Sequence, residues 1–120
     1  MMEIIKTKDC PKFISQDNAI VQEIVSNRNS SVKNQSLAKV TIQPGNSIFE
    51  HYHKKTEELY HIIKGKGTMY IEDEKLIIGA GETVVILPGQ KHKIRNHTDT
   101  DLVMLVMCAP GYEDEDQIIV

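Results

Sequence analysis

The chain has little arginine, little cysteine and no long apolar run, and each shortage excludes a class of protein. Only two of its 14 basic residues are arginine, Arg28 and Arg95, which leaves little for forked recognition of phosphate. The two cysteines, Cys10 and Cys108, lie far apart and form no CxxC pair, so a disulfide framework is excluded. No apolar run approaches the ~20 residues that cross a bilayer, and the N-terminal segment MMEIIKTKDCPKF has no apolar signal-peptide core. We therefore expect a soluble, cytoplasmic protein without a membrane partner.

The remaining composition is that of one ordinary globular domain. The chain has 120 residues, of which 40% are hydrophobic and 26% are charged, and its formal net charge is −3. A domain of this length buries about 65% of its unfolded surface, so it needs neither a metal nor a disulfide merely to fold. The mild acidic balance gives no electrostatic footprint for nucleic acid.

Short apolar runs and regularly spaced turns predict an all-β fold with little helix. Ala19–Val25 is β-branched, residues 27–36 form a polar loop, and turn signals recur every 8–12 residues from Leu37 onward. This spacing is typical of a sandwich or small barrel. Leu102–Cys108 is apolar on both faces, which predicts burial on both sides. Residues 113–120, EDEDQIIV, predict a solvated turn followed by a short edge strand.

The five histidines all lie between positions 51 and 97. His51 and His53 are separated by one residue on an expected strand, so both imidazoles point to the same face, together with Phe49. Two neutral imidazoles on one face can chelate a divalent cation. Two exposed histidines on a solvated strand are the alternative for such a pair. His97 is expected at the surface.

A carboxylate on the next expected strand is a candidate third ligand beside His51 and His53. The polar turn KKTE leads into a second strand that opens at Glu58. Glu58 and Tyr60 share one face of that strand, so Glu58 is the candidate ligand and Tyr60 lies behind it. Glu57 is expected in solvent, and His61 is expected to point away as a packed or interface residue.

A third imidazole comes from a separate segment of the chain. Pro88 and Gly89 turn the chain sharply, and His92 opens the next strand. Three imidazoles and one carboxylate leave one or two positions open on a five- or six-coordinate ion, as catalytic sites do. Such an ion supplies Lewis acidity or a bound water of lowered pKa. Cys108 ends a buried run and is expected to be an inert core thiol.

The same residues carry a resemblance to the cupin superfamily, in particular to small single-domain cupins of the mannose-6-phosphate isomerase type. The first cupin motif, G(X)5HXH(X)3-4E(X)6G, is matched by Gly45, His51, His53, Glu58 and Gly65. The second motif, G(X)5PXG(X)2H(X)3N, is matched by Gly81, Gly89, His92 and Asn96. It departs at the expected proline, where Leu87 stands and Pro88 follows. The likeness extends over about residues 34–116.

The resemblance implies an antiparallel jelly-roll β-barrel that occupies residues 1–120 as a single cupin domain. Its core would span about residues 34–112, with a strand segment and loop over residues 1–33 and an acidic tail over residues 113–120. It also implies assembly as a homodimer, and one divalent ion held by His51, His53, Glu58 and His92. Three nitrogens and one oxygen suit iron, manganese, nickel, zinc or copper, so the identity of the metal stays open.

Two functions are compatible with such a barrel, because one fold hosts many chemistries. The first is a metal-dependent enzyme, isomerase-like or of the dioxygenase type, on a small polar organic or sugar-like substrate. Tyr60 would then be a catalytic hydrogen-bond donor or acid, and Phe49, Tyr70 and Asn96 would complete the pocket. The alternative is a non-catalytic module that binds a small molecule or a metal. In either case few cations face the site, which favours a neutral or weakly acidic ligand over a phosphosugar.

Three lysines at the expected mouth of the barrel are the exception to this shortage of cations. They are Lys54, Lys91 and Lys93. These side chains can compensate for the missing arginines if a phosphate binds.

Overall fold

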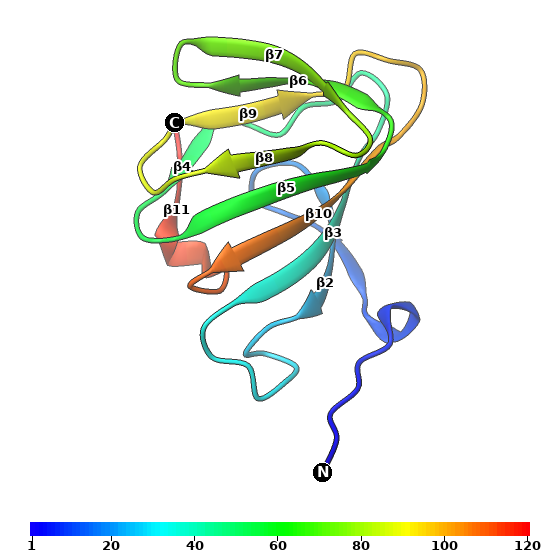
Figure 1. Ribbon diagram of the computed structural model, residues 1–120, viewed down its shortest axis with the longest axis vertical. Coiled ribbons are helices and arrows are strands. Elements are labelled where there is room, and N and C mark those ends of the chain that lie inside the picture. The colour runs from blue at the N-terminus through cyan, green and yellow to red at the C-terminus, as the bar shows by residue number, and fades with distance from the viewer.

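Two antiparallel sheets face each other and enclose the core (Figure 1). The computed structural model describes residues 1–120. The first sheet has the order β1-β2-β3-β10-β5-β8 and the second the order β11-β4-β9-β6-β7. The strands are β1 (Lys12–Ile14), β2 (Ile20–Val25), β3 (Ser36–Ile42), β4 (His51–His53), β5 (Glu57–Lys64), β6 (Lys66–Ile71), β7 (Glu74–Gly79), β8 (Thr83–Ile86), β9 (His92–Arg95), β10 (Leu102–Ala109) and β11 (Gln117–Ile119).

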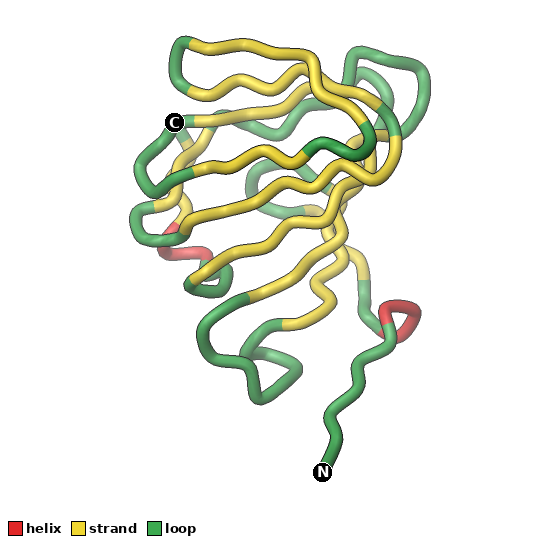
Figure 2. The backbone as a smooth tube through the Cα atoms, in the orientation of Figure 1, coloured by secondary structure: helices red, strands yellow, loops and turns green.

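Helix is confined to two single turns, as the tube view shows (Figure 2). They are the 3-10 helices η1 (Thr7–Asp9) and η2 (Asp114–Asp116). Neither has the length or the apolar character needed to span a membrane. The prediction of an all-β fold with little helix is therefore confirmed.

From β3 onward the chain crosses between the sheets at almost every connection, which is the jelly-roll arrangement. Strands β3, β5, β8 and β10 lie in the first sheet, and the intervening strands β4, β6, β7, β9 and β11 lie in the second. Every strand pair is antiparallel. The two sheets are consequently joined by many short connections, and their inner faces meet.

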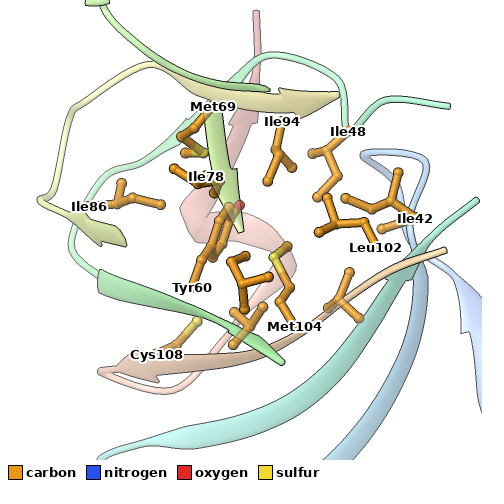
Figure 3. Packing of buried hydrophobic residues seen from close by; sticks show 14 residues of the cluster. Ile42, Ile48, Tyr60, Met69, Ile78, Ile86, Ile94, Leu102, Met104 and Cys108 are labelled. Atoms are coloured by element: carbon orange, nitrogen blue, oxygen red, sulfur yellow. The ribbon is translucent and has the colours of Figure 1, made fainter. Parts of the chain in front are cut away.

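Strand alternation builds the core between the sheets (Figure 3). Along β10, every second residue points inward and is buried, namely Leu102, Met104, Val106 and Cys108, while the residues that alternate with them are half-buried. On β5 the buried set includes Tyr60 and Ile62. The expected burial of Leu102–Cys108 on both sides therefore holds for the inner face alone, because no second layer of this chain covers the outer face.

The strand expected to carry Phe49, His51 and His53 on one face is shorter than the pattern indicated. Ser47 makes a single bridge to Arg95, and regular pairing begins only at His51. Between them the backbone is irregular, so Ile48 is buried and Phe49 remains 50% exposed. The face that carries His51 and His53 therefore does not extend back to Phe49.

Gly65 joins β5 to β6 at a place where only glycine fits. Its φ is +86°, and a Cβ at this position would lie 2.5 Å from the carbonyl oxygen of Asp101. Gly45 has a similar φ of +80°, but a Cβ there would meet no atom within 4 Å. Both positions carry the conformational penalty of a left-handed residue, and only Gly65 adds a steric clash.

We expect Gly65→Ala to lower the free energy of unfolding by about 2–4 kcal/mol and Gly45→Ala by about 1 kcal/mol. Chemical denaturation of the two variants and the unchanged protein measures the difference. Equal losses for the two variants would show that the close approach to Asp101 costs nothing.

Candidate metal centre

Four buried side chains converge between the two sheets. His51 and His53 lie on β4, His92 begins β9, and Glu58 lies on β5. One donor atom from each lies within 4.8 Å of the others, and all four residues are buried. His51 and His92 are directly paired across β4 and β9, which fixes these two imidazoles side by side. The structure thus brings together the four residues that the sequence pattern selects.

The imidazoles are oriented by acceptors at their Nδ1 atoms. His51 Nδ1 lies 2.8 Å from the carbonyl oxygen of Phe49, and His92 Nδ1 lies 2.9 Å from that of Gln90. A carbonyl oxygen only accepts, so each Nδ1 carries the hydrogen. His53 Nδ1 lies 3.7 Å from the carboxylate of Asp116. With Nδ1 of His51 and His92 engaged in this way, their Nε2 atoms are the ones available to a metal ion, as in metal-bound histidines with second-shell partners.

The donor atoms face one another at distances that an ion can bridge. Glu58 Oε1 lies 3.2 Å from His92 Nε2 and 3.4 Å from His53 Nε2. Two ligands about 2.1 Å from one ion are about 3.0–3.4 Å apart at octahedral or tetrahedral angles. Moreover, both ring nitrogens of His53 are buried without a hydrogen-bond partner. An orphaned buried polar atom is destabilising, so a divalent ion fits this donor set.

Protonation of the centre without a metal follows from burial and charge. Burial would lower the pKa of His53, but the nearby Glu58 carboxylate outweighs burial, and the pKa is raised above 6.5. Burial, aided by the neighbouring His92, lowers the pKa of His51. Burial would raise the pKa of Glu58, but the imidazoles of His53 and His92 hold that pKa at about 2. Glu58 is therefore ionised, and His53 takes up a proton before His51 does.

A cavity of about 460 Å³ adjoins the centre. Tyr60 and Glu58 both line it, so the expected position of Tyr60 behind Glu58 agrees with the structure. Burial raises the pKa of Tyr60 well above 10, so its hydroxyl stays protonated and can donate a hydrogen bond. His61 hydrogen-bonds Thr83 and points away from the site, as expected.

The other expected pocket residues do not line this cavity. Phe49 is turned outward by the irregular backbone before β4. Tyr70 is half-buried, and its ring stacks under the Lys93 ammonium, 4.9 Å away. Asn96 is buried, but its amide donates to the carbonyl oxygens of Ile42 and Thr100 and so closes a turn.

Several further residues that the sequence analysis named lie outside the lining of the cavity. None of Lys54, Lys91 and Lys93 lines the cavity. His97 is exposed, as expected, and hydrogen-bonds Thr68. Cys10 is buried beside the carbonyl oxygens of Lys6 and Ile24, far along the chain from the centre.

The sequence analysis missed the contacts that three residues make near the centre: those of Asp17, of Asp116, and of Cys108, which is buried as expected. Asp17 reaches it from the segment between β1 and β2, with Oδ2 3.6 Å from His51 Nε2. Asp116 Oδ2 lies 3.7 Å from His53 Nδ1, and Asp116 accepts from the backbone of Lys55. Cys108 donates to Glu58 Oε2 across 3.4 Å. Asp17 and Asp116 lie outside any motif. The signal for Cys108 is its position directly opposite Glu58 on the neighbouring strands β10 and β5.

The chain is thus a jelly roll with a buried cluster of three imidazoles and one carboxylate in its interior, and this cluster can hold a metal ion. Residues 38–108 match the cupin domain family, and this chain belongs to that family. A protein of Methanocaldococcus jannaschii without a characterised function is 33% identical over 117 residues, which is 96% of this chain and 94% of its own length.

Two further proteins show how broad the similarity is. The oxalate-binding protein of Thermotoga maritima is 31% identical over 71 residues, 59% of this chain and 59% of that protein. A variant of Streptomyces Pac13 solved with uridine has a TM-score of 0.82 at 14% identity and covers 100% of this chain and 92% of that one. Pac13 is described as a nucleoside dehydratase. At this identity the likeness to Pac13 shows a shared fold.

Cys108 offers a test of how the carboxylate is oriented. Burial and Glu58 raise the pKa of the Cys108 thiol, so it remains a donor to Glu58 Oε2 and leaves Oε1 facing the imidazoles. We expect Cys108→Val to weaken zinc binding about 10-fold and Cys108→Ser, which keeps a donor, to weaken it less. Zinc titration by calorimetry measures both, with Cys10→Ala as the buried-thiol control. Equal affinities for the Cys108→Val variant and the unchanged protein would contradict this role.

The raised pKa of His53 predicts a pH dependence of zinc binding. An imidazole must be neutral to bind a metal, and His53 in the metal-free protein is protonated below its raised pKa. Affinity should therefore fall as the pH drops through that value, and binding should release more protons at about pH 6 than at about pH 8.5. Calorimetry in buffers of different ionisation enthalpy measures the release. The same release at both pH values would contradict the assignment.

Proposed function

We propose that this protein is a metal-dependent cupin enzyme that acts on a small polar organic or sugar-like molecule. The observation that carries the proposal is the adjacency of a cavity and a buried donor set whose four donor atoms lie within 4.8 Å of one another. His51, His53, Glu58 and His92 would hold one divalent ion of iron, manganese, nickel, zinc or copper. Such an ion supplies Lewis acidity or a bound water of lowered pKa. The reaction class is isomerase-like or dioxygenase-like.

The chain's own residues would bind and orient the substrate beside this centre. Tyr60 is the candidate catalytic residue, because its hydroxyl is protonated, lines the cavity and shares a strand face with Glu58. Its role would be to donate a hydrogen bond or a proton to a substrate oxygen. Asp17 Oδ2 lies 3.6 Å from His51 Nε2 and places a second carboxylate at the same centre. The apolar inner face of the first sheet excludes water from one side of the cavity.

The site residues can be tested by metal content before any substrate is known. We expect purified protein without a tag to hold about one divalent ion per chain, and His51→Ala or Glu58→Gln to lower this to about a tenth or less. His61→Ala is the matched control, because this histidine lies on the same strand as Glu58 and faces away from it. Elemental analysis measures the content. Full occupancy in the Glu58→Gln variant would contradict the proposed centre.

A second candidate is a module that binds a small molecule without turning it over. The similarity to an oxalate-binding protein supports it, although this similarity extends over only 59% of the chain. Incubating metal-loaded protein with small molecules and recovering them afterwards distinguishes the two functions. Saturable binding of a small molecule that is recovered unchanged after prolonged incubation, with and without oxygen, favours the module.

We also propose that the protein forms a homodimer through the outer face of its first sheet. Leu59 lies beside Met107 on one neighbouring strand and Val85 on the other, and Leu59 and Val85 are exposed. This contiguous apolar patch is the kind of surface that subunit contacts cover. Light scattering should give about twice the chain mass, and Leu59→Lys should give a monomer. A monomeric unchanged protein would contradict the dimer.

A further inference from the structure

The cavity beside the centre has an apolar floor and walls from both ends of the chain. Its floor is the inner face of β3, β5 and β10, and its walls come from residues 13–19 and 112–117. Twelve of its 23 lining residues are hydrophobic. The apolar floor includes Val40, Tyr60 and Met104. A ligand with an apolar body can therefore be buried there.

One buried donor in this cavity has no partner within the protein. Gln117 begins β11, lines the cavity and is only 6% exposed. Its Nε2 atom is buried and makes no hydrogen bond. Buried donors are almost always paired, so an unpaired one on a residue that lines a cavity points to a ligand with an acceptor atom.

A chain of hydrogen bonds fixes which end of this amide is free. Gln16 Nε2 donates to the Tyr112 hydroxyl at 3.3 Å, and that hydroxyl donates to Gln117 Oε1 at 2.5 Å. The hydroxyl has one hydrogen, and Oε1 receives it. Burial raises the pKa of Tyr112, so the hydrogen stays in place. The Gln117 amide consequently presents its two N–H groups as the unpaired end.

The charges around the cavity disfavour an anionic ligand. Six carboxylates line it, and the only basic residue among its lining is Arg28. Arg28 is already engaged, with its guanidinium 2.7 Å from Glu23 and 3.4 Å from Glu113. No side-chain cation is thus left to pair with a phosphate or carboxylate. The two positive charges of the proposed divalent ion are balanced by the carboxylates of Glu58 and Asp17, so the lining offers an anion no net positive charge.

We propose that the cavity binds an uncharged organic molecule with an apolar body, and that Gln117 donates a hydrogen bond to a carbonyl or hydroxyl oxygen of it. This inference rests on the proposed function, because it names the substrate class of the same site. A cationic ligand would be attracted by the carboxylates, but without an acceptor oxygen it would leave the Gln117 amide unpaired. Gln117 is therefore a specificity-determining residue, and Tyr112 is its positioning residue.

Matched ligand pairs test the charge and the acceptor together. The probes are benzamide with benzoate, nicotinamide with nicotinate, and glucose with glucuronate, each pair differing by one carboxylate. They are titrated into ¹⁵N-labelled protein with and without zinc, and the side-chain amide signals of Gln117 are followed. We expect at least one neutral probe to bind at least about 10-fold more tightly than its anion and to shift those signals. The inference is overturned if no neutral probe binds, if the anions bind as tightly, or if the Gln117 signals do not move.

Variants assign the effect to the amide. Gln117→Leu should weaken binding of the neutral probe about 10-fold or more, whereas Gln43→Leu, at an exposed glutamine, should not change it. Tyr112→Phe keeps the ring and removes the hydroxyl that orients the amide, so it should also weaken binding if Gln117→Leu fails to fold. Unchanged affinity in a folded Gln117→Leu or Tyr112→Phe protein would overturn the inference.

Zinc content measured on the same samples separates this inference from the proposed function. Zinc at about one per chain with no neutral ligand bound would contradict the inference and leave the metal centre standing. Gln117-dependent binding by a protein that takes up no metal would contradict the proposed function and leave the inference standing.

Discussion

The fixed orientation of three buried imidazoles is the constraint on which the rest of the site depends. Backbone carbonyl oxygens hold the Nδ1 hydrogens of His51 and His92, and the Asp116 carboxylate faces Nδ1 of His53. The Nε2 atoms of His53 and His92 face Glu58, and that of His51 lies 3.6 Å from Asp17 Oδ2. Without these outer partners the rings could rotate, and four donors in one place would be a buried polar cluster of high cost rather than a metal centre.

The middle of the chain supplies the donors, and its two ends supply the surroundings. Asp17 approaches His51 from the segment before β2, and Asp116 and Gln117 approach from η2 and β11. β11 pairs with β4 in such a register that Gln117 lies opposite His53. The cavity and the centre are thus parts of one structure: the strand that offers the unpaired amide also fixes the strand that carries two imidazoles.

Residues on regular strands were predictable from the sequence, and residues placed by long-range closure were not. Period-two alternation correctly separates Glu58 and Tyr60 from His61 on β5, because that strand is long and paired on both sides. The same rule fails at Phe49, where the backbone is irregular. The acidic run at residues 113–116 reads as a solvated turn followed by an edge strand, and both are present. Nothing local reveals that Asp116 contacts His53, since that contact depends on how β11 meets β4.

The tautomers of the histidines give the most direct test of the central claim. Long-range ¹H–¹⁵N spectra of the imidazoles, recorded at neutral pH before and after addition of one equivalent of zinc, report which nitrogen carries the hydrogen and which binds the ion. The account predicts hydrogen on Nδ1 of His51 and His92 in the metal-free protein, and a zinc-induced shift at Nε2 of His51, His53 and His92. Hydrogen on Nε2 of His51 and His92, or zinc-induced shifts confined to His61 and His97, would contradict it.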